Sequence, residues 1–406
     1  MQINRPIHAG SIWRCIWLLP VIVFGTVRFQ SSPVRAQAEP ATATGSTVEV
    51  REWVILECDP SLSHANPQET VGSTLPESLL SLRAAETEQK NEPSPVGVIR
   101  FMGHSNQKFA VHLTIPETGV FYASWPLAHM RGNRAVWYDL TIGATPQRLI
   151  PLDNSHWLYP LRNIDGPYIT SISRSEKFLL YDATFPFTLP LGIAEGNTKS
   201  DSVRIRNTGP TLLHDLVIYR PTRDGTGWAT ASLAEVPPES SGTPTTAPAE
   251  RPVVQFAPVD NDPSHSLNAD WTARLADWEL DPAELNLILK ILRSNVLKSP
   301  EMTAIFRLDD AAINRLLPLE ISPQPARIRR LAIVIARHVD PQMPQLLDQL
   351  IAQLGDADWH KREAASSQLA RFGTGANPKL REATRSSDPE VVLRAERLLS
   401  HNSARY

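Results

Sequence analysis

The side chains that could do chemistry are scattered through this sequence of 406 residues and form no known catalytic motif. Eleven histidines are present, but none belongs to an HExxH sequence, and no CxxC pair accompanies them. Closely spaced ligands of these kinds are the usual signature of a zinc site. His104 and His112 are interpreted as surface imidazoles. We therefore expect no metal ion and no other cofactor.

Ser105 and Lys108 match the SxxK pattern of a class of acyl-transfer enzymes in which the serine is the nucleophile. Those enzymes also carry SDN and KTG sequences, and neither is present here. A GxSxG motif, a P-loop and a GxGxxG fingerprint in its proper context are absent as well. The VDNDPS sequence at 259–264 lacks most ligands of a calcium loop, so a turn and a helix cap are expected there. The sequence predicts a noncatalytic protein, with an enzyme of unfamiliar type as the third hypothesis.

Five tryptophans fall in the half of the chain that has a β pattern. They are Trp53, Trp125, Trp137, Trp157 and Trp228. Each lies in a run with other apolar residues, so packing in a hydrophobic core is the expected role. Sugar-binding sandwiches often use exposed aromatic side chains instead. A carbohydrate- or cell-wall-binding β-sandwich protein is therefore the alternative hypothesis, and exposed indoles would favour it.

The first residues of the chain have the pattern of an export signal. Arginines precede an apolar run at 15–27 that is 13 residues long, whereas a membrane-spanning helix needs about 20. Small residues at Ala36 and Ala38 then fit a cleavage site. We predict a signal peptide over 1–38 and export to the periplasm, the cell surface or the medium. An uncleaved leader is the alternative, and it would be the only contact with a membrane.

Removing the signal would take away four arginines and no acidic residue, leaving 36 basic and 43 acidic residues and a net charge of −7. This balance lacks the basic footprint of a nucleic-acid-binding protein, so no nucleic-acid partner is expected. Cys58 would remain as the single cysteine, which excludes an internal disulfide. It alternates in register with Val48, Val50, Val54 and Leu56. A buried, small apolar side chain is the expected role of Cys58.

Residues 48–235, which follow a short linker at 39–47, have the pattern of an antiparallel β-sandwich region. Short runs rich in Val, Ile, Phe and Tyr are separated by turns that contain proline, glycine or asparagine. The clearest piece runs from Ser202 to Pro221, where apolar and polar side chains alternate on both sides of an Asn-Thr-Gly-Pro turn. This pattern predicts a half-buried pair of antiparallel strands.

Ser202 to Pro221 resembles the strand, Asn-x-Gly turn, strand segment of immunoglobulin-like modules in bacterial surface proteins. The resemblance covers these 20 residues. It implies a sandwich that serves as a spacer or an adhesion platform. It transfers no catalytic residue to this chain.

The composition changes at 236–250, which holds four prolines and five Ser or Thr in 15 residues. Such a segment buries too little apolar surface to fold, so we predict an extended Pro/Ser/Thr-rich linker over 236–270. The segment after the prolines, 251–259, is rich enough in Val and Phe to form a returning strand.

Residues 271–340 are predicted to form a small α+β unit. Asp281-Pro282, followed by Glu284, has the pattern of a capping box at the start of a helix. Two later runs, 302–308 and 327–339, are typical of strands; a wholly helical segment is the alternative. The second run carries four arginines, which are interpreted as a solvated strand face: Arg327, Arg329, Arg330 and Arg337.

Residues 341–406 are predicted to form short helices, two of which begin after Asp358 and Asp388. These two segments are alike, because three positions recur 30 residues later. The pairs are Asp358 and Asp388, Ala365 and Ala395, and Leu369 and Leu399. Aspartate caps each helix, alanine lets helices approach closely, and leucine fills the groove between them.

This tail is similar to HEAT or armadillo-type repeats and to the tails of uncharacterised exported bacterial proteins, over roughly 50 residues that begin LGDADWHKREAASSQLARFG at Leu354. The resemblance implies stacked helical hairpins, of which about two are visible, and a surface that binds another protein. Arg362, Arg394 and Arg397 are the candidate interaction residues. Because single short helices bury little apolar area, we expect the tail to dock on the rest of the chain or on a partner.

The sequence thus predicts a multidomain α+β chain: an N-terminal antiparallel β-sandwich region, a Pro-rich linker, and a small α+β unit followed by HEAT-like α-helical hairpins. We expect a noncatalytic exported protein that acts as an envelope scaffold or a protein-interaction module through its tail. A protein partner in the cell envelope is expected.

Overall fold

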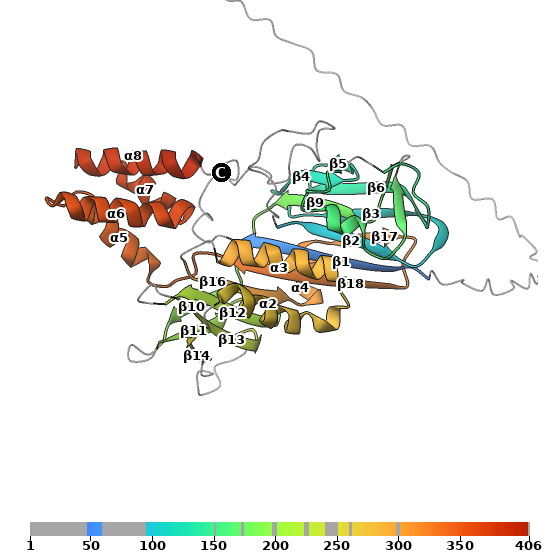
Figure 1. Cartoon of the computed structure of the whole chain (residues 1–406), viewed down its shortest axis with the longest axis horizontal. Coiled ribbons are helices and arrows are strands. Elements are labelled where there is room, and N and C mark those ends of the chain that lie inside the picture. Colours follow the sequence, from blue (N-terminus) through green and yellow to red (C-terminus); the bar gives the residue numbers. More distant parts are fainter. Residues whose placement is uncertain are drawn as a thin grey trace, which may run out of the picture. The chain divides into compact units, whose positions relative to one another are not determined.

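The computed structural model describes residues 47–58, 95–149, 152–171, 174–196, 201–222, 227–239, 251–259, 262–297 and 301–404. Within these ranges the chain is a mixed α+β structure with large, mostly antiparallel sheets (Figure 1), which confirms the expected class. The predicted signal peptide, nearly all of the linker at 39–47, and residues 240–250 of the Pro-rich segment lie outside the described residues.

The largest sheet has nine strands in the order β15-β13-β12-β16-β18-β1-β2-β9-β4. Their bounds are β15 (Ala257–Pro258), β13 (Trp228–Val236), β12 (Leu213–Pro221), β16 (Thr303–Leu308), β18 (Arg327–Ala336), β1 (Glu49–Cys58), β2 (Gly97–Met102), β9 (Leu179–Thr184) and β4 (Val120–Trp125). The two central strands, β18 and β1, are parallel, while every other pairing in this sheet is antiparallel.

A second sheet has the order β17-β3-β6-β7-β8, with β5 also paired to β6, and a third has the order β10-β11-β14. The strands of the second are β17 (Leu319–Ser322), β3 (Ser105–Thr114), β6 (Arg134–Gly143), β7 (Tyr168–Ser171), β8 (Arg174–Glu176) and β5 (His129–Arg131). Those of the third are β10 (Leu191–Glu195), β11 (Ser202–Asn207) and β14 (Val253–Gln255).

The predicted strand pair between Ser202 and Pro221 is wrong. Both strands form, but β11 pairs with β10 and β14, whereas β12 pairs with β13 and β16 in the nine-stranded sheet. The turn between them is a corner rather than a hairpin, and Asn207 stabilises it. Its side chain donates to the carbonyls of Thr211 and Val236 at 2.7 and 2.8 Å and accepts from the Gly209 N–H at 2.9 Å.

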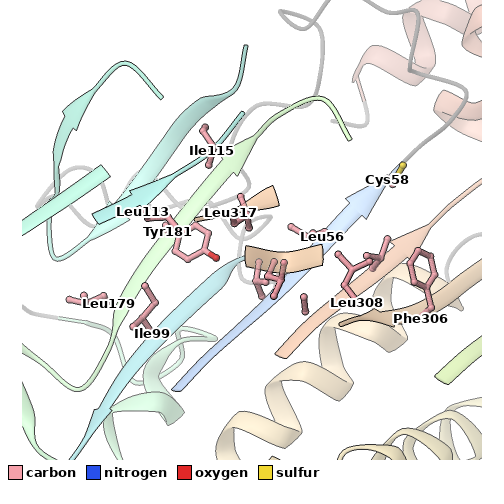
Figure 2. Packing of buried hydrophobic residues seen from close by; sticks show 14 of the residues in the cluster. Leu56, Cys58, Ile99, Leu113, Ile115, Leu179, Tyr181, Phe306, Leu308 and Leu317 are labelled. Carbon is pink, nitrogen blue, oxygen red and sulfur yellow. The ribbon is translucent and has the colours of Figure 1, made fainter. Parts of the chain in front are cut away.

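One face of the nine-stranded sheet shares a hydrophobic cluster with the other two sheets. Val50, Val54 and Leu56 of β1 belong to it together with Phe109 and Leu113 of β3. Figure 2 shows part of this cluster, in which residues of the two larger sheets lie close together. Cys58 is buried in it, as expected.

The opposite face is covered by helices α2 (Pro263–Arg274) and α3 (Pro282–Val296). Alternate residues of a strand point to opposite sides of the sheet, so each strand contributes side chains to both faces. Trp53 and Ile55 of β1 pack there with Trp271 of α2 and Ile288 of α3. Two predicted helix starts are confirmed. The Asp262 side chain accepts from the Ser264 N–H, and Asp281 forms the predicted capping box with Glu284.

The predicted separation of a linker at 236–270 from an α+β unit at 271–340 needs correction. The two strands expected in that unit form as β16 and β18, but they lie in the middle of the nine-stranded sheet, beside β12 and β1. The described part of the linker also contains β14, β15 and the beginning of α2. Both strands are largely buried, and β1 and β12 beside them come from distant parts of the chain, so the local pattern could not place the boundary.

The tail consists of α5 (Met343–Gln353), α6 (Trp359–Phe372), α7 (Asn377–Ala383) and α8 (Pro389–Ala404), with 3-10 turn η5 (Gly373–Ala376) between α6 and α7. The four helices pack on one another (Figure 1). Their buried side chains form a cluster whose members all come from the tail, including Ala365, Leu369 and Ala395. Within the described residues the tail therefore builds its core from its own helices.

The remaining short elements are α4 (Asp310–Leu316), η3 (Tyr159–Arg162) and η4 (Ala276–Trp278). Helix α4 begins at the Asp309 cap, whose carboxylate accepts from the Ala312 N–H at 2.6 Å, and it leads into β17. Among the described residues, no helix combines the length and the apolar character required to cross a membrane.

Candidate functional site

The arginines predicted as an interaction surface lie in α6 and α8, and two of them are engaged inside the tail. Arg394 contacts Glu390 at 2.7 Å, Glu363 at 3.3 Å and the Ser366 hydroxyl at 2.9 Å. Arg362 donates to the carbonyls of Asp356 and Ala357 at 2.7 and 3.0 Å, and its Nε lies 3.4 Å from Glu390. Arg397 is exposed.

These contacts form a charged seam between α6 and α8, made of Arg362, Glu363, Glu390 and Arg394. The capping carboxylates Asp358 and Asp388 accept from the N–H groups two residues later in both helices, as the repeat predicts. The seam neutralises its own charges. Arg362 and Arg394 consequently hold the two helices together rather than offering free cations to a partner.

Large apolar side chains flank the seam and are exposed to solvent. Trp359, the first residue of α6, is 54% exposed, and Leu393 of α8 is 52% exposed. Trp359 precedes Glu363 by four residues, so the two share a helix face, and Leu393 is next to Arg394. Tryptophan, with tyrosine and arginine, is enriched among the residues that contribute most to binding at protein interfaces.

The tryptophans of the β half behave differently. Trp53, Trp125, Trp137 and Trp157 are buried, and Trp228 is half-buried against the helix-covered cluster. Three donate their indole N–H groups inside the protein, to Glu284, to Glu176 and to the Pro126 carbonyl. The exposed aromatic face on which the carbohydrate-binding alternative rests is therefore not formed by these side chains.

The residues with potential catalytic or metal chemistry are not brought into a common site. His112 lies 4.0 Å from Glu320 on neighbouring strands, and His104 is exposed. The Ser105 hydroxyl accepts from the Gln107 N–H at 3.1 Å, while Lys108 lies 3.4 Å from Asp139. Among the described residues, no group of three or more His, Cys, Asp or Glu could hold a metal ion.

The nine-stranded sheet carries two buried ion pairs, one on each face. The first joins Glu52 of β1 to Arg330 of β18, which are register partners. The two residues are only 3% and 5% exposed, and the Tyr181 hydroxyl donates to the other Glu52 oxygen at 2.8 Å. Arg330 Nη1 donates to Asn314 Oδ1 at 2.9 Å, whereas Arg330 Nη2 is buried without a hydrogen-bond partner. The prediction that the four arginines of this strand form a solvated face is therefore wrong for Arg330, which is buried.

The environment of this pair fixes its protonation. Burial raises the pKa of Tyr181 well above its usual value of 10.0, and the negative charge of Glu52 raises it further. Burial alone would lower the pKa of Arg330, but the charge of Glu52 and the hydrogen bond to it raise the pKa overall. Tyr181 is therefore a neutral donor and Arg330 a cation at any physiological pH.

A cavity of about 320 Å³ opens beside Arg330. Its walls come from α4, from the segment into β17 and from the start of β18, and its lining residues are Asp310, Asn314, Pro318, Leu319, Glu320, Ile328 and Arg330. Arg330 is the buried member of this set, while Asp310, Asn314, Glu320 and Ile328 are exposed. Arg330 lines this cavity, but its nitrogen without a partner, Nη2, is itself buried from solvent.

The second pair joins Arg100 of β2 to Glu284 of α3 on the helix-covered face. Arg100 Nη1 donates to Glu284 at 2.5 Å, and Nη2 donates to the Asp165 carbonyl at 2.5 Å. Glu284 also accepts from the Trp53 indole at 3.2 Å and from the Asp281 N–H at 3.1 Å. Further hydrogen bonds to both members stabilise this buried pair, because they offset the cost of removing the two charges from water.

The pair of Glu52 and Arg330 was not predicted from the sequence, although a signal was present. Val48, Val50, Val54, Leu56 and Cys58 alternate along β1, and the position missing from that series is Glu52. A carboxylate within an apolar face is either paired or very costly. The pattern therefore indicated a buried partner, but not that Arg330, 278 residues away, would supply it.

Comparison with known proteins yields little. No family model matches this chain, and no curated protein matches it. Among solved structures, the yeast delta-COP-I mu-homology domain complexed with Dsl1 WxWxV peptide aligns at 8% identity and a TM-score of 0.26, covering 73% of this chain and 97% of that one. A likeness this weak supports no conclusion about fold or function.

Proposed function

We propose that this chain is a noncatalytic exported protein that binds another protein of the cell envelope through its helical tail. The observation that carries the proposal is the exposed pair of large apolar side chains, Trp359 and Leu393, beside the charged seam of α6 and α8. Tryptophan is enriched at the hot spots of protein interfaces, so its exposure on the tail favours a protein partner there.

The packing of the tail supports this role. Its core is built by its own helices, so its outer faces do not have to cover another part of the chain. Stacked helical hairpins of the HEAT type, which the tail is proposed to form, commonly present such surfaces to protein partners. The ion pairs of the seam join α6 to α8, the two helices that carry Trp359 and Leu393.

Site-specific photo-cross-linking in native cells tests the proposal. A benzophenone amino acid at position 359 should yield one defined protein adduct, and the same probe at the exposed Lys108 should not. The double variant Trp359→Ser/Leu393→Ser should abolish co-purification of that partner. Leu127→Ser, which removes an apolar side chain that is 78% exposed in the β half, is the matched control and should not.

Adducts of equal yield at both positions, or co-purification unchanged by the double variant, would refute the tail as the binding surface. Export is tested separately by N-terminal sequencing of the protein recovered from the envelope. We expect mature protein that begins at Glu39, after the proposed cleavage at Ala38. Recovery of the chain from the cytoplasm with its first residues intact would contradict export.

A further inference from the structure

The exposed face of α6 and α8 is apolar at one end and cationic at the other, and this polarity indicates the chemistry of its partner. We propose that the face binds an acidic amphipathic segment of another protein, with apolar side chains toward Trp359 and carboxylates toward Arg371. This inference rests on the proposed function and deepens it, because it states which kind of segment the tail binds and in which direction.

Two equivalent stripes of side chains form this face. Residues four apart in a helix lie on the same side of it. In α6 one such series runs from Trp359 to Arg371, and in α8 another runs from Pro389 to His401; every fourth residue in both is exposed. Each member of the second stripe follows its counterpart in the first by 30 residues, so the stripes are equivalent positions of the repeat.

The two helices are neighbours and run parallel, so the stripes lie along one surface. Near the beginning of both helices, Arg362 lies 3.4 Å from Glu390. Further along both helices, Arg394 lies 3.3 Å from Glu363 and 2.9 Å from the Ser366 hydroxyl. Because the contacts advance in the same direction in α6 and in α8, the two N-terminal halves lie together, and so do the two C-terminal halves.

The N-terminal half of this surface is apolar. Trp359 and Leu393 are 54% and 52% exposed, and Pro389 is exposed as well. Glu363 is the charged residue of the stripes in this half, and its pairing with Arg394 neutralises it. This end of the face therefore offers apolar contacts to a partner and no unpaired charge within the stripes.

The C-terminal half carries unpaired positive charge. Arg371 and Arg397 are exposed, and neither forms an ion pair with a carboxylate among the residues that the structure describes. Arg371 lies in the last turn of α6, where a cation also compensates the helix dipole. Arg397 lies seven residues before the end of α8, beyond the reach of that effect. Since Glu396 is the neighbouring exposed carboxylate, two cations face one anion at this end.

The distance between the two ends fits a short segment. Trp359 and Arg371 are 12 positions apart in one helix, which is about 18 Å at 1.5 Å per residue. A partner helix of about three turns covers this length. Buried apolar anchors contribute most of the affinity of such contacts, whereas opposite charges select the partner and its direction.

The first test is selection of phage-displayed random peptides, about 16 residues long so that a helix spans about 24 Å, on the full mature chain. We expect enriched sequences with Trp, Phe or Leu at one end and Asp or Glu at the other. Selection on Arg371→Glu/Arg397→Glu should enrich Lys and Arg in place of the acidic residues, because the charge of the surface is reversed. Arg315→Glu/Arg327→Glu, at exposed positions of α4 and β18, is the matched control and should select the same acidic peptides as the wild type.

The affinity of one selected peptide, measured by fluorescence anisotropy, assigns the contacts. Arg371→Glu/Arg397→Glu should weaken it at least about tenfold, while Arg371→Lys/Arg397→Lys keeps the charge and should stay within about threefold of the wild type. Trp359→Ser should also weaken it at least about tenfold. Glu396→Gln should strengthen it about twofold, because that change removes a carboxylate that repels the peptide. Circular dichroism checks that each variant is folded.

Photo-cross-linking in cells separates this inference from the proposed function. The probe at position 359 should give less adduct in the charge-reversed variant than in the lysine variant. An undiminished adduct would overturn the acidic segment but leave the tail as a protein-binding surface, whereas no adduct at position 359 in any variant would refute the proposed function and this inference with it. Enrichment of no peptides, or of the same peptides on the wild type and the charge-reversed variant, would overturn the inference as well.

Discussion

The two faces of the nine-stranded sheet each contain a buried ion pair, but the two arginines differ in how completely they are hydrogen-bonded. Each buries an arginine with a glutamate, and each has a buried tyrosine from a strand of the sheet: Tyr181 of β9 on one face and Tyr219 of β12 on the other. On the helix-covered face the nitrogens Nη1 and Nη2 of Arg100 both have acceptors. On the face shared by the sheets, Arg330 Nη2 is buried without a hydrogen-bond partner. The difference lies in how completely each buried pair is bonded within the fold, and it should appear in how each pair responds to mutation.

The largest effect is expected where the bonding is complete. Arg100→Met leaves the Glu284 carboxylate buried with no cation, and such changes lower the free energy of unfolding by about 3–5 kcal/mol. The variant also loses the tie to the Asp165 carbonyl. Urea unfolding followed by circular dichroism measures this change. A loss below about 1 kcal/mol would mean that this pair contributes no more than a surface ion pair.

The pair at the cavity should tolerate removal as a unit. Arg330→Met alone leaves Glu52 buried and should cost a similar 3–5 kcal/mol or so. The double variant Glu52→Leu/Arg330→Met should recover most of that loss, because apolar replacements of a buried pair are often neutral or stabilising. The coupling energy from the double-mutant cycle is the measurement. Additive effects of the two single changes would show that the pair does not act as a unit.

The buried tyrosines give a smaller effect that depends on pH. Tyr181→Phe removes a hydrogen bond to a charged group and should cost about 1.5–3 kcal/mol near neutral pH. Burial raises the pKa of Tyr181 above the 10.0 of an exposed tyrosine, so the unfolded chain loses its proton first as the pH rises. Tyrosine therefore stabilises the fold fully below pH 10.0, and that contribution is lost progressively above it.

The measurement is the slope of unfolding free energy against pH above 10 in the wild type and the variant. The wild type should fall more steeply, by up to about 1.4 kcal/mol per pH unit for one tyrosine. Tyr219→Phe on the helix-covered face is the matched variant, because burial likewise raises the pKa of Tyr219, whose hydroxyl accepts from the Trp271 indole at 3.1 Å. Equal slopes in all three proteins would contradict the burial of both hydroxyl groups.

Local elements were largely predictable from the sequence, because their signals are local. The Asp281 capping box, the helices that follow Asp358 and Asp388, and the strand pattern of 327–339 depend on residues close to one another in the chain. Pairing was not predictable, since it depends on distant partners. The parallel pairing of β1 with β18 joins segments almost 280 residues apart, and the sequence of neither strand indicates its partner.

The same limit applies to the candidate site. Glu52 stands out in its own strand as a carboxylate among apolar residues, but Arg330 lies among other arginines and has the appearance of an exposed residue. Only the register of β1 against β18 shows that Arg330 points into the core while Arg329 does not. In the tail, by contrast, the 30-residue repeat placed Ala365 and Ala395 correctly in the core, because helix packing there is between neighbours.

The smallest effect on stability is expected for an exposed ion-pair cluster on the same two strands, which tests whether burial or strand position makes an arginine important. Arg51 and Arg329 are register partners next to Glu52 and Arg330 on the same two strands, and both contact Glu279, at 2.8 and 3.3 Å. The Glu279 side chain is 64% exposed, so water screens these contacts. Glu279→Gln should change the unfolding free energy by less than about 1 kcal/mol, and added salt should reduce even that. Thermal unfolding at low and high ionic strength measures it. A loss as large as that of Arg100→Met would mean that the strands themselves, rather than exclusion of water, make their arginines important, and the contrast between the two faces would then have no physical basis.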